Sequence, residues 1–276
     1  MHAIAINACK KKWQNDRVQN CSAEEQPSLR KAIRKYWTGE AARRGGVGAT
    51  RALCAALWDF ARNSTPWRLR QRYGDADYDW DYRVNTTSAS VGWRDRLLGV
   101  LNSPYQPTEP ALFHEMLKTL AEQAQVDSGG FNFREFNFSD FTFVDLGSGK
   151  GRTLLMASDY PFRRIVGVEL LVSLHQIAQE NLRQYKSDTQ RCFALESICA
   201  DAAGFPLPDD PLVVYQFNPF PEPVLRQAVA NLERSAREHP RAIYVLYHNP
   251  LLAHVLEESA VLRKVCGTDQ FAIFRA

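Results

Sequence analysis

Hydrophobic and polar residues follow two different periods along this chain. Between residues 29 and 63 the apolar residues recur three and four positions apart, and a glycine-rich stretch, Gly45–Gly48, interrupts the pattern. This spacing predicts two amphipathic helices, of which the second spans Thr50–Asn63. Residues 1–28 are polar and show no period, so we expect a flexible N-terminal tail there.

Short apolar runs alternate with helical patterns from about residue 104 onward, after a proline-rich joint. This alternation predicts an α/β fold, a doubly wound and mostly parallel seven-stranded sheet. The expected strands are Thr142–Leu146, Arg164–Glu169, Phe193–Ile198, Leu212–Phe217, Ala242–Tyr247, Val261–Val265 and Phe271–Phe274. The expected helices are Ala111–Gln123, Arg152–Ser158, Leu171–Tyr185, Glu222–Glu238 and Leu251–Glu257.

The last two strands are joined by only the five residues Cys266–Gln270, so we expect a hairpin and a final antiparallel strand. The chain then divides into the tail 1–28, a basic helical extension with its joint 29–103, and an α/β domain 104–276. No apolar run is long enough to cross a bilayer, and the start of the chain does not resemble a secretory signal. We therefore expect a cytoplasmic protein.

A glycine-rich turn joins the first expected strand of the domain to a helix. It reads Val144-Asp-Leu-Gly-Ser-Gly-Lys-Gly-Arg152, and such a strand–turn–helix corner is typical of nucleotide binding. A P-loop needs a different glycine spacing before its Gly-Lys pair and Ser or Thr after it. A dinucleotide fingerprint needs a third glycine where Arg152 stands. The pattern left is Gly-x-Gly-x-Gly, which by itself is also compatible with a turn that binds nothing.

Polar residues also follow the next three expected strands. In an open parallel sheet, ligands bind beyond the carboxyl ends of the strands. Glu169 ends the second strand, where a carboxylate can accept two hydrogen bonds from a ribose diol. Asp201 follows the third strand and can accept from the exocyclic amine of adenine, while the backbone N–H of Ala202 meets a ring nitrogen. Asn218 follows the fourth strand, in Asn-Pro-Phe, where its amide can orient a nucleophile.

Four motifs together resemble those of the class I S-adenosylmethionine (SAM)-dependent methyltransferases. They are Asp145-Leu-Gly-Ser-Gly-Lys-Gly-Arg, Val166-Gly-Val-Glu-Leu, Ala200-Asp-Ala and Phe217-Asn-Pro-Phe, and the likeness covers about residues 104–276. It implies a Rossmann-like methyltransferase with SAM as cofactor. The cofactor-binding residues that it implies are Thr108, Asp145, Gly147, Ser148, Gly149, Gly151, Glu169, Leu170, Asp201, Ala202 and Asn218. In this family the glycine loop and its acid bind the methionine part.

A narrower resemblance is to the seven-strand, non-SET protein lysine methyltransferases. They share the proline-containing segment before the glycine loop and an asparagine after the fourth strand. This likeness implies that Tyr105 and Thr108 fold over the methionine end of the cofactor, with Tyr105 and Asn218 as catalytic residues. The acceptor is then a protein lysine, or else a small molecule. Only one proline precedes Phe220, which departs from the pattern of the nucleic-acid amino methyltransferases.

The extension adds an uneven distribution of charge to a chain whose net charge is only +3. Eleven basic residues and two acids lie between Arg30 and Arg72. They form either a solvated face of the two helices or a surface for an anionic partner, that is RNA, DNA or membrane. Acids then alternate with aromatics over Asp75–Tyr82, and this alternation predicts a strand or an extended segment. The cysteines and histidines show no metal-ligand spacing, so no metal is expected.

Two alternatives to a methyltransferase follow from the same features. One is an NAD-type dinucleotide oxidoreductase, which the missing third glycine and the final hairpin oppose. The other is a catalytically inactive SAM-binding protein that docks on nucleic acid through its basic extension.

Overall fold

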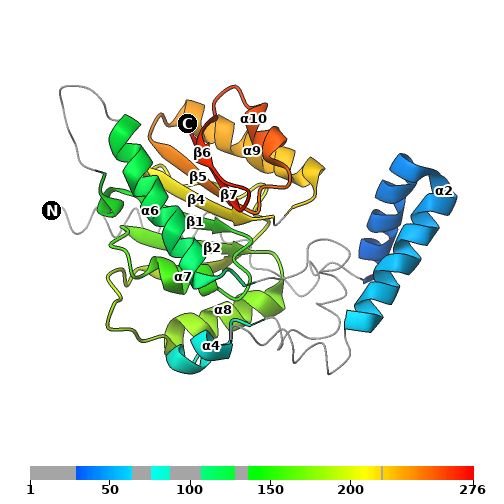
Figure 1. Cartoon of the computed structure of the whole chain (residues 1–276), viewed down its shortest axis with the longest axis horizontal. Coiled ribbons are helices and arrows are strands. Elements are labelled where there is room, and N and C mark those ends of the chain that lie inside the picture. The colour runs from blue at the N-terminus through cyan, green and yellow to red at the C-terminus, as the bar shows by residue number, and fades with distance from the viewer. Residues whose placement is uncertain (1–28, 64–75, 88–106, 128–135, 219) are drawn as a thin grey trace.

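The computed structural model describes residues 29–63, 76–87, 107–127, 136–218 and 220–276. Figure 1 shows a central sheet covered by helices, preceded along the chain by the long helix α2. The tail 1–28 and the basic residues 68–72 lie outside the described residues. No helix in the described parts of the chain is both long and apolar enough to cross a membrane.

The sheet has seven strands in the order β3-β2-β1-β4-β5-β7-β6. Five strands, β1 to β5, pair in parallel, whereas β7 runs antiparallel to both β5 and β6. The doubly wound sheet with an antiparallel hairpin strand is therefore confirmed. The strands are β1 Thr142–Leu146, β2 Arg164–Glu169, β3 Leu195–Cys199, β4 Leu212–Phe217, β5 Ile243–His248, β6 Arg263–Gly267 and β7 Phe271–Arg275.

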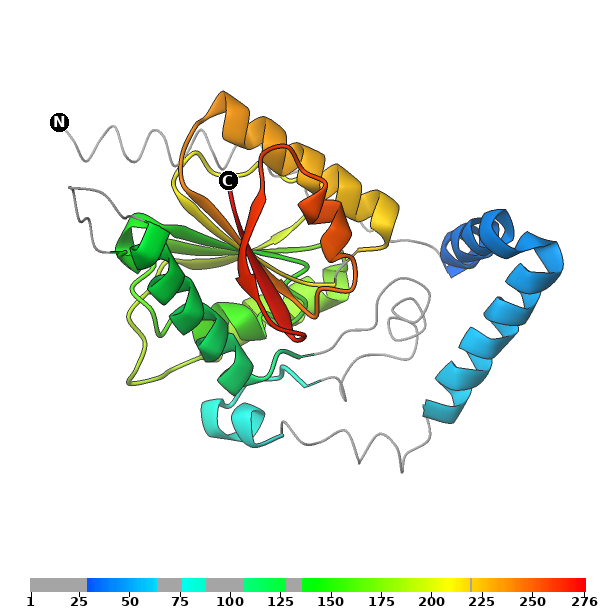
Figure 2. The same cartoon turned by 45° about the horizontal axis from the view of Figure 1, so that its top comes forward.

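Helices cover both faces of this sheet, as Figure 2 shows with the sheet seen nearly edge-on. One face packs under α6 (Pro110–Asp127) and α7 (Arg152–Ala157), with α8 (Val172–Gln184) beside them. The opposite face packs under α9 (Glu222–Glu238) and α10 (Ala253–Glu257). Successive residues of a strand point to opposite faces, so Val144 and Val214 enter the α9 core while Phe143 and Val213 enter the α6 core. The central strands are apolar on both sides because both sides are buried.

Two strands begin two residues later than their apolar runs suggest. Before β3, the backbone N–H groups of Arg191 and Cys192 donate to the carbonyl of Ser158, and Phe193 is 78% exposed. Before β6, the Ser259 hydroxyl accepts from the N–H groups of Val261 and Leu262. These amides are engaged outside the sheet, so the ladder starts only after them.

Helix α2 (Leu29–Asn63) contains a break at the glycine-rich stretch. Gly45 has φ 73° and ψ 168°, a conformation outside the helical region that glycine adopts without a steric cost. The two arms on either side contact each other: Ala32 is buried among apolar residues that include Leu53. The Trp37 Nε1–H donates to Thr50 Oγ1 across the bend at 3.2 Å. The two expected helices are thus the two arms of α2.

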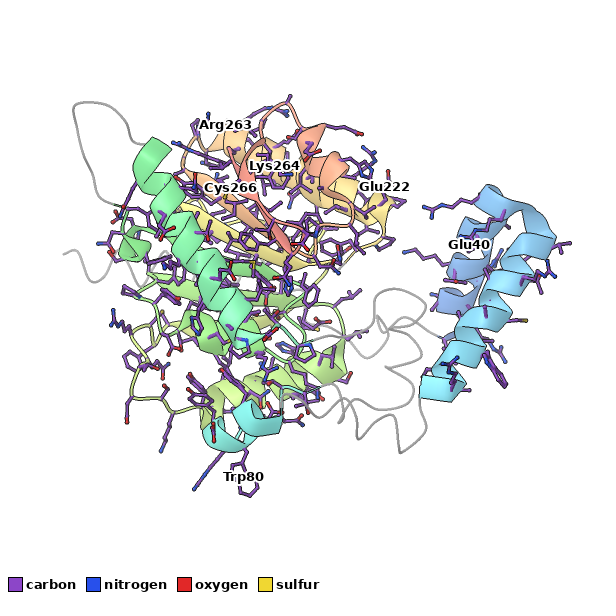
Figure 3. The ribbon with its side chains drawn as sticks, in the orientation of Figure 1. Glu40, Trp80, Glu222, Arg263, Lys264 and Cys266 are labelled. Carbon is purple, nitrogen blue, oxygen red and sulfur yellow. The ribbon has the colours of Figure 1, made fainter. Side chains whose placement is uncertain are left out.

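The prediction of an extended acidic–aromatic segment is wrong, because Ala76–Tyr82 forms the short helix α4. Helical spacing places Tyr78 and Tyr82 on one face, with ring centroids 4.7 Å apart, and the Tyr82 ring lies 5.3 Å from that of Tyr185, which directly follows α8. Trp80 is 85% exposed and projects outward (Figure 3). The alternation of acids and aromatics with period two was misleading here. Packing near α8 favours a helix, which places aromatics four residues apart on one face.

Candidate functional site

The glycine loop between β1 and α7 turns through three left-handed residues. Gly147, Gly149 and Gly151 have φ values of 88°, 55° and 81°, where a side chain would be strained. The N–H groups of Gly147 and Ser148 both donate to the carbonyl of Val168, at 2.9 and 3.0 Å. The Gly151 N–H donates to the Ser148 carbonyl at 2.8 Å. The loop is therefore closed by its own hydrogen bonds and by the end of β2.

Glu169, the last residue of β2, is buried against this loop. Its Oε2 accepts from the Gly149 N–H and its Oε1 from the Leu171 N–H, each at 2.8 Å. Burial raises the pKa of this carboxyl group, while these backbone hydrogen bonds oppose the rise. Leu170 supplies a third backbone hydrogen bond to this group. A carboxylate has about four lone-pair sites, so one remains for a ligand.

Asp145 lies in β1 beside the same loop and is also buried. Its Oδ2 accepts from the hydroxyl of Thr153, in the first turn of α7. Burial is the main cause that raises the pKa of Asp145 to about 7; the hydrogen bond from Thr153 opposes this rise, and the charge of Glu169 adds to it. Two buried carboxyl groups thus lie at the carboxyl ends of β1 and β2. In an open parallel sheet this edge is where the ligand-binding crevice is expected.

Close packing under the loop fixes its position on the sheet. A Cβ atom on Gly167 of β2 would lie 2.6 Å from Leu154 Cδ1 and 2.8 Å from Ser148 Cβ. Real Cβ atoms do not approach other carbons that closely, so this strand position needs glycine. The Ser148 hydroxyl is buried and has no hydrogen-bond partner among the described residues.

Three further expected ligands lie at the same edge of the sheet. Asp201 is exposed two residues after β3, and its Oδ1 accepts from the Ala203 N–H at 3.0 Å. The neighbouring Ala202 is buried. Leu170 follows Glu169 directly and is 49% exposed, an apolar surface next to the crevice. The structure therefore gathers the predicted residues of β1, β2 and β3 along one edge, and their roles remain predictions.

Asn218 follows β4 in a left-handed conformation with φ 40°. Its Oδ1 accepts from the Tyr247 hydroxyl at 2.8 Å. Asn249 follows β5 in the same way with φ 50°, and since Phe217 pairs with His248 in the sheet, the two asparagines stand at equivalent places on adjacent strands. The sequence analysis missed Asn249. Its signal was the repetition of Asn-Pro after two neighbouring strands.

A buried chain of polar side chains runs along the α6 face of the sheet behind these turns. Thr108 Oγ1 lies 2.7 Å from the Tyr215 hydroxyl, which lies 2.8 Å from His248 Nδ1. The His248 ring stacks on Phe217 with centroids 3.8 Å apart. Burial lowers the pKa of His248 to about 4 and raises that of Tyr215, so both are neutral at pH 7. The expected catalytic residue Tyr105 lies outside the described residues.

Comparison with known proteins gives only distant structural likenesses. No family model matches the chain, and no curated protein sequence matches it. An RNA methyltransferase from Salinibacter ruber in complex with S-adenosyl-L-homocysteine is 19% identical over 62% of this chain and 92% of its own, with a TM-score of 0.40. The human methyltransferase 10 domain containing protein is 10% identical over 76% of this chain and 96% of its own, with a TM-score of 0.46.

A third similar structure is a predicted N6-adenine-specific DNA methylase from Listeria monocytogenes. It is 15% identical over 61% of this chain, the match spans about half (51%) of its own length, and the TM-score is 0.40. At these identities and TM-scores the likenesses are too weak to assign an activity. The fold assignment depends on the strand order of the chain itself.

Proposed function

We propose that the chain is a SAM-dependent methyltransferase whose cofactor binds along the carboxyl edge of β1 and β2. One observation carries this proposal: the crevice presents two buried carboxyl groups, Asp145 and Glu169, while the N–H groups of its glycine loop are largely used within the protein. Four of these N–H groups, at Gly147, Ser148, Gly149 and Gly151, already donate to protein oxygens. The crevice therefore offers acceptors and negative charge to a ligand.

SAM matches such a crevice better than a dinucleotide does. Its ribose diol and its ammonium group donate hydrogen bonds, and its sulfonium carries a positive charge. A pyrophosphate, in contrast, needs unengaged backbone N–H groups and a positive field at the loop. Two carboxyl groups at that position would repel it. The acceptor-rich crevice thus favours SAM over NAD.

The described residues fit the parts of SAM in sequence order. Glu169 would accept from the ribose diol with its remaining lone pair, and Asp145 with the glycine loop would hold the methionine end. Asp201 and the backbone of Ala202 would meet adenine, with the exposed side chain of Leu170 as an apolar contact to its ring. When bound, SAM supplies an activated methyl group.

The β4–β5 side of the edge would position the acceptor. Asn218 is held by the Tyr247 hydroxyl and by its left-handed turn, so its amide has a fixed direction. Its task would be to align the nucleophile and hold it in place, as methyl transfer requires little else from the protein. The neighbouring His248 is neutral, because burial lowers its pKa to about 4. A neutral surrounding favours the uncharged, nucleophilic form of an amine.

A protein lysine is the acceptor that we propose within this class. The support is the resemblance of the glycine loop, the Glu169 strand and Asn218 to the non-SET lysine methyltransferases, together with the amide at the acceptor side. The test is transfer of a labelled methyl group from SAM to lysine-containing peptides, with the same peptides carrying arginine in place of lysine as controls. Equal labelling of both peptide sets, or none, would exclude lysine as the acceptor.

Calorimetric titration of the purified chain with SAM and S-adenosylhomocysteine tests the class itself, with NADH and ATP as controls. We expect micromolar binding of the first two and none of the controls. Binding of NADH without SAM would replace the proposal by an oxidoreductase, and binding of no ligand would make the glycine loop a structural turn.

A second function, docking on nucleic acid, is favoured by the charge of α2. All eight of its Lys and Arg residues are exposed, against two acids, and Trp58 is 70% exposed among them. The basic residues are Arg30, Lys31, Arg34, Lys35, Arg43, Arg44, Arg51 and Arg62. Cations interleaved with an exposed aromatic suit phosphates and stacked bases. Binding to random RNA or DNA should weaken steeply with salt and disappear when Arg43, Arg44 and Arg51 are replaced by Glu. Salt-independent binding would argue against this function.

A further inference from the structure

Lys150, between the second and third glycines of the loop, has no exposed surface. Its Nζ donates to Asn85 Oδ1 at 3.0 Å and to the Thr87 carbonyl at 2.6 Å. Both acceptors belong to the segment that follows α4, far before the loop in the sequence. A buried ammonium group is costly unless it is paired and hydrogen-bonded, and here the extension supplies these partners. Burial lowers the pKa of Lys150 to about 8, although Asp79 favours its charged form.

Asn181 of α8 joins the same two segments through its amide. Its Oδ1 accepts from the Asn85 N–H at 2.8 Å, and its Nδ2 donates to the Asn85 carbonyl at 2.9 Å. The same Nδ2 lies 2.9 Å from the Lys150 carbonyl. One side chain thus binds the backbone of the extension and the backbone of the glycine loop together.

Asp79 of α4 holds the segment in the shape that Lys150 requires. Its Oδ2 accepts from the N–H groups of Thr86 and Thr87, each at 2.8 Å, and its Oδ1 accepts from the Thr86 hydroxyl. The three interactions close the turn between α4 and Thr87. This turn presents the Thr87 carbonyl and the Asn85 side chain to Lys150.

Apolar contacts anchor the segment on the helices around the loop. Val84 is buried against Leu155 of α7 and Tyr185, which directly follows α8. The Tyr78 ring lies under the guanidinium of Arg152, at 4.5 Å from the centroid, and Arg152 directly follows the third glycine. The segment is therefore held beside the glycine loop by apolar and aromatic contacts as well as by hydrogen bonds.

We infer that the segment Ala76–Thr87 is a working part of the cofactor site, and that Lys150 and Asn85 position the glycine loop for SAM. The loop must keep Gly149 and Gly151 left-handed for the Gly149 N–H to reach Glu169, and Lys150 is the residue between them. Fixing both its ammonium group and its carbonyl fixes this stretch of backbone. Docking of the segment and binding of SAM then stabilise each other, because a coupling between two sites is reciprocal. The inference rests on the proposed function for the ligand, and on the contacts above for the clamp.

The variants Lys150→Met and Asn85→Ala, in the full chain, test this inference. Lys150→Met removes the ammonium group at nearly constant volume, and Asn85→Ala removes one acceptor without altering the loop sequence. Lys118→Met on α6 is the matched control, because its side chain is 77% exposed. The measurements are the Kd for SAM by calorimetry and hydrogen exchange at residues 84–87 and 147–151, with and without SAM.

We expect Lys150→Met to weaken SAM binding by about tenfold or more, Asn85→Ala by less, and Lys118→Met not at all. In the ligand-free protein, exchange at 147–151 should rise in both clamp variants while exchange in β5 stays unchanged. SAM should slow exchange at 84–87 in the wild-type chain only. A Lys150→Met protein with wild-type affinity and wild-type exchange at 147–151 would overturn the inference. If the wild-type chain binds no SAM, the proposed function fails, and the ligand-free exchange at 147–151 still decides whether the clamp orders the loop.

Discussion

The carboxyl edge of the sheet has two halves, one with buried carboxyl groups and one with neutral polar groups. At the β1–β2 half, Asp145 and Glu169 are buried carboxyl groups. At the β4–β5 half, the strands are followed by the amides of Asn218 and Asn249, and β5 ends in the neutral ring of His248, whose pKa burial lowers to about 4. A cationic cofactor needs the first surrounding, and an uncharged amine nucleophile needs the second. One edge can serve both because the strands keep the two groups of residues apart.

Replacement of Glu169 should have the largest effect on SAM affinity. In Glu169→Ala the crevice loses both the acceptor proposed for the ribose and the partner of the Gly149 N–H. Hydrogen bonds to a charged group contribute about 1.5–3 kcal/mol each, so we expect SAM affinity to fall by roughly 100-fold or more. Calorimetry on folded protein measures it, with Glu196→Ala as control, because Glu196 lies partly exposed on β3 and pairs with Arg164. Unchanged affinity in a folded Glu169→Ala protein would refute the ribose role.

The variant Asp145→Asn distinguishes the effect of this buried carboxyl group on protein stability from its effect on SAM binding. Burial raises the pKa of Asp145 to about 7 from an ordinary value of 3.8, so between these pH values the folded state binds more protons than the unfolded state. Stability then falls as pH rises through this window, and the loss is complete above pH 7. We expect Asp145→Asn, which has no such charge, to be more stable than wild type at pH 8, by on the order of 4 kcal/mol, and equal near pH 4.

Urea unfolding of both proteins at several pH values checks this, and Asp210→Asn is the control because Asp210 pairs with Arg163 at the surface. The same Asp145→Asn protein should bind SAM more weakly, since it lacks the negative charge proposed for the methionine end. A variant that is less stable than wild type at pH 8 would show that the buried charge is compensated in the folded state.

Asn218→Ala should lower turnover and leave SAM affinity unchanged, because the residue belongs to the neutral half. Loss of one positioning hydrogen bond corresponds to about tenfold in rate. Alanine at φ 40° also introduces backbone strain. Asn249→Ala is the matched control for this strain, since Asn249 has φ 50° at the equivalent place on β5. Initial rates and SAM titrations on both variants decide the matter, and a loss of SAM binding in Asn218→Ala would place the residue in the cofactor half.

The acidic half of the edge could be predicted from the sequence because its signals are local. The glycine loop and Glu169 follow strands whose apolar runs are continuous, and the sheet pairs them next to each other. The positions of β1, β2 and β4 could be predicted for the same reason. The conformation of Ala76–Tyr82 could not, since contacts with Tyr185, far along the chain, select a helix there.

The neutral half could not be predicted in the same way, because it depends on contacts between residues that are far apart in the sequence. Thr108 and Tyr215 are 107 residues apart, and Tyr215 reads in the sequence as one more aromatic of a buried strand. His248 ends β5, and its spacing to the other histidines and to the cysteines does not indicate a metal site. Lys150 was read as part of the ligand-binding turn, whereas its side chain binds the segment before the domain. Such roles appear only when the fold brings the partners together.

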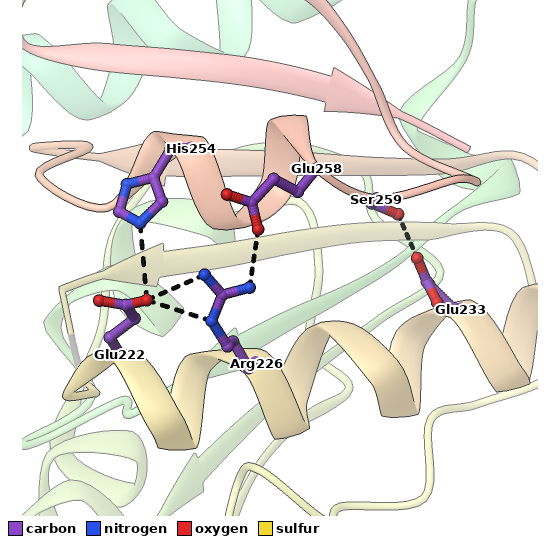
Figure 4. A network of polar contacts seen from close by, with 6 residues as sticks. All are labelled: Glu222, Arg226, Glu233, His254, Glu258 and Ser259. Carbon is purple, nitrogen blue, oxygen red and sulfur yellow. Dashed lines mark hydrogen bonds and ion pairs between the residues drawn. The ribbon is translucent and has the colours of Figure 1, made fainter.

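Substitutions in the network of charged side chains between α9 and α10, at the surface, should have the smallest effect. Arg226 of α9 donates to Glu222 at 2.9 Å and to Glu258 at 2.8 Å, which ties α9 to α10, and His254 lies 3.7 Å from Glu222 (Figure 4). Water solvates these side chains and salt screens them, so exposed pairs of this kind contribute little to stability. We expect Arg226→Ala to leave the urea midpoint, its salt dependence and SAM affinity within error of wild type. A clear loss of stability in Arg226→Ala would mean that exposed ion pairs stabilise this protein as much as buried charged groups do. The other predictions assume the opposite, that buried groups have the larger effect.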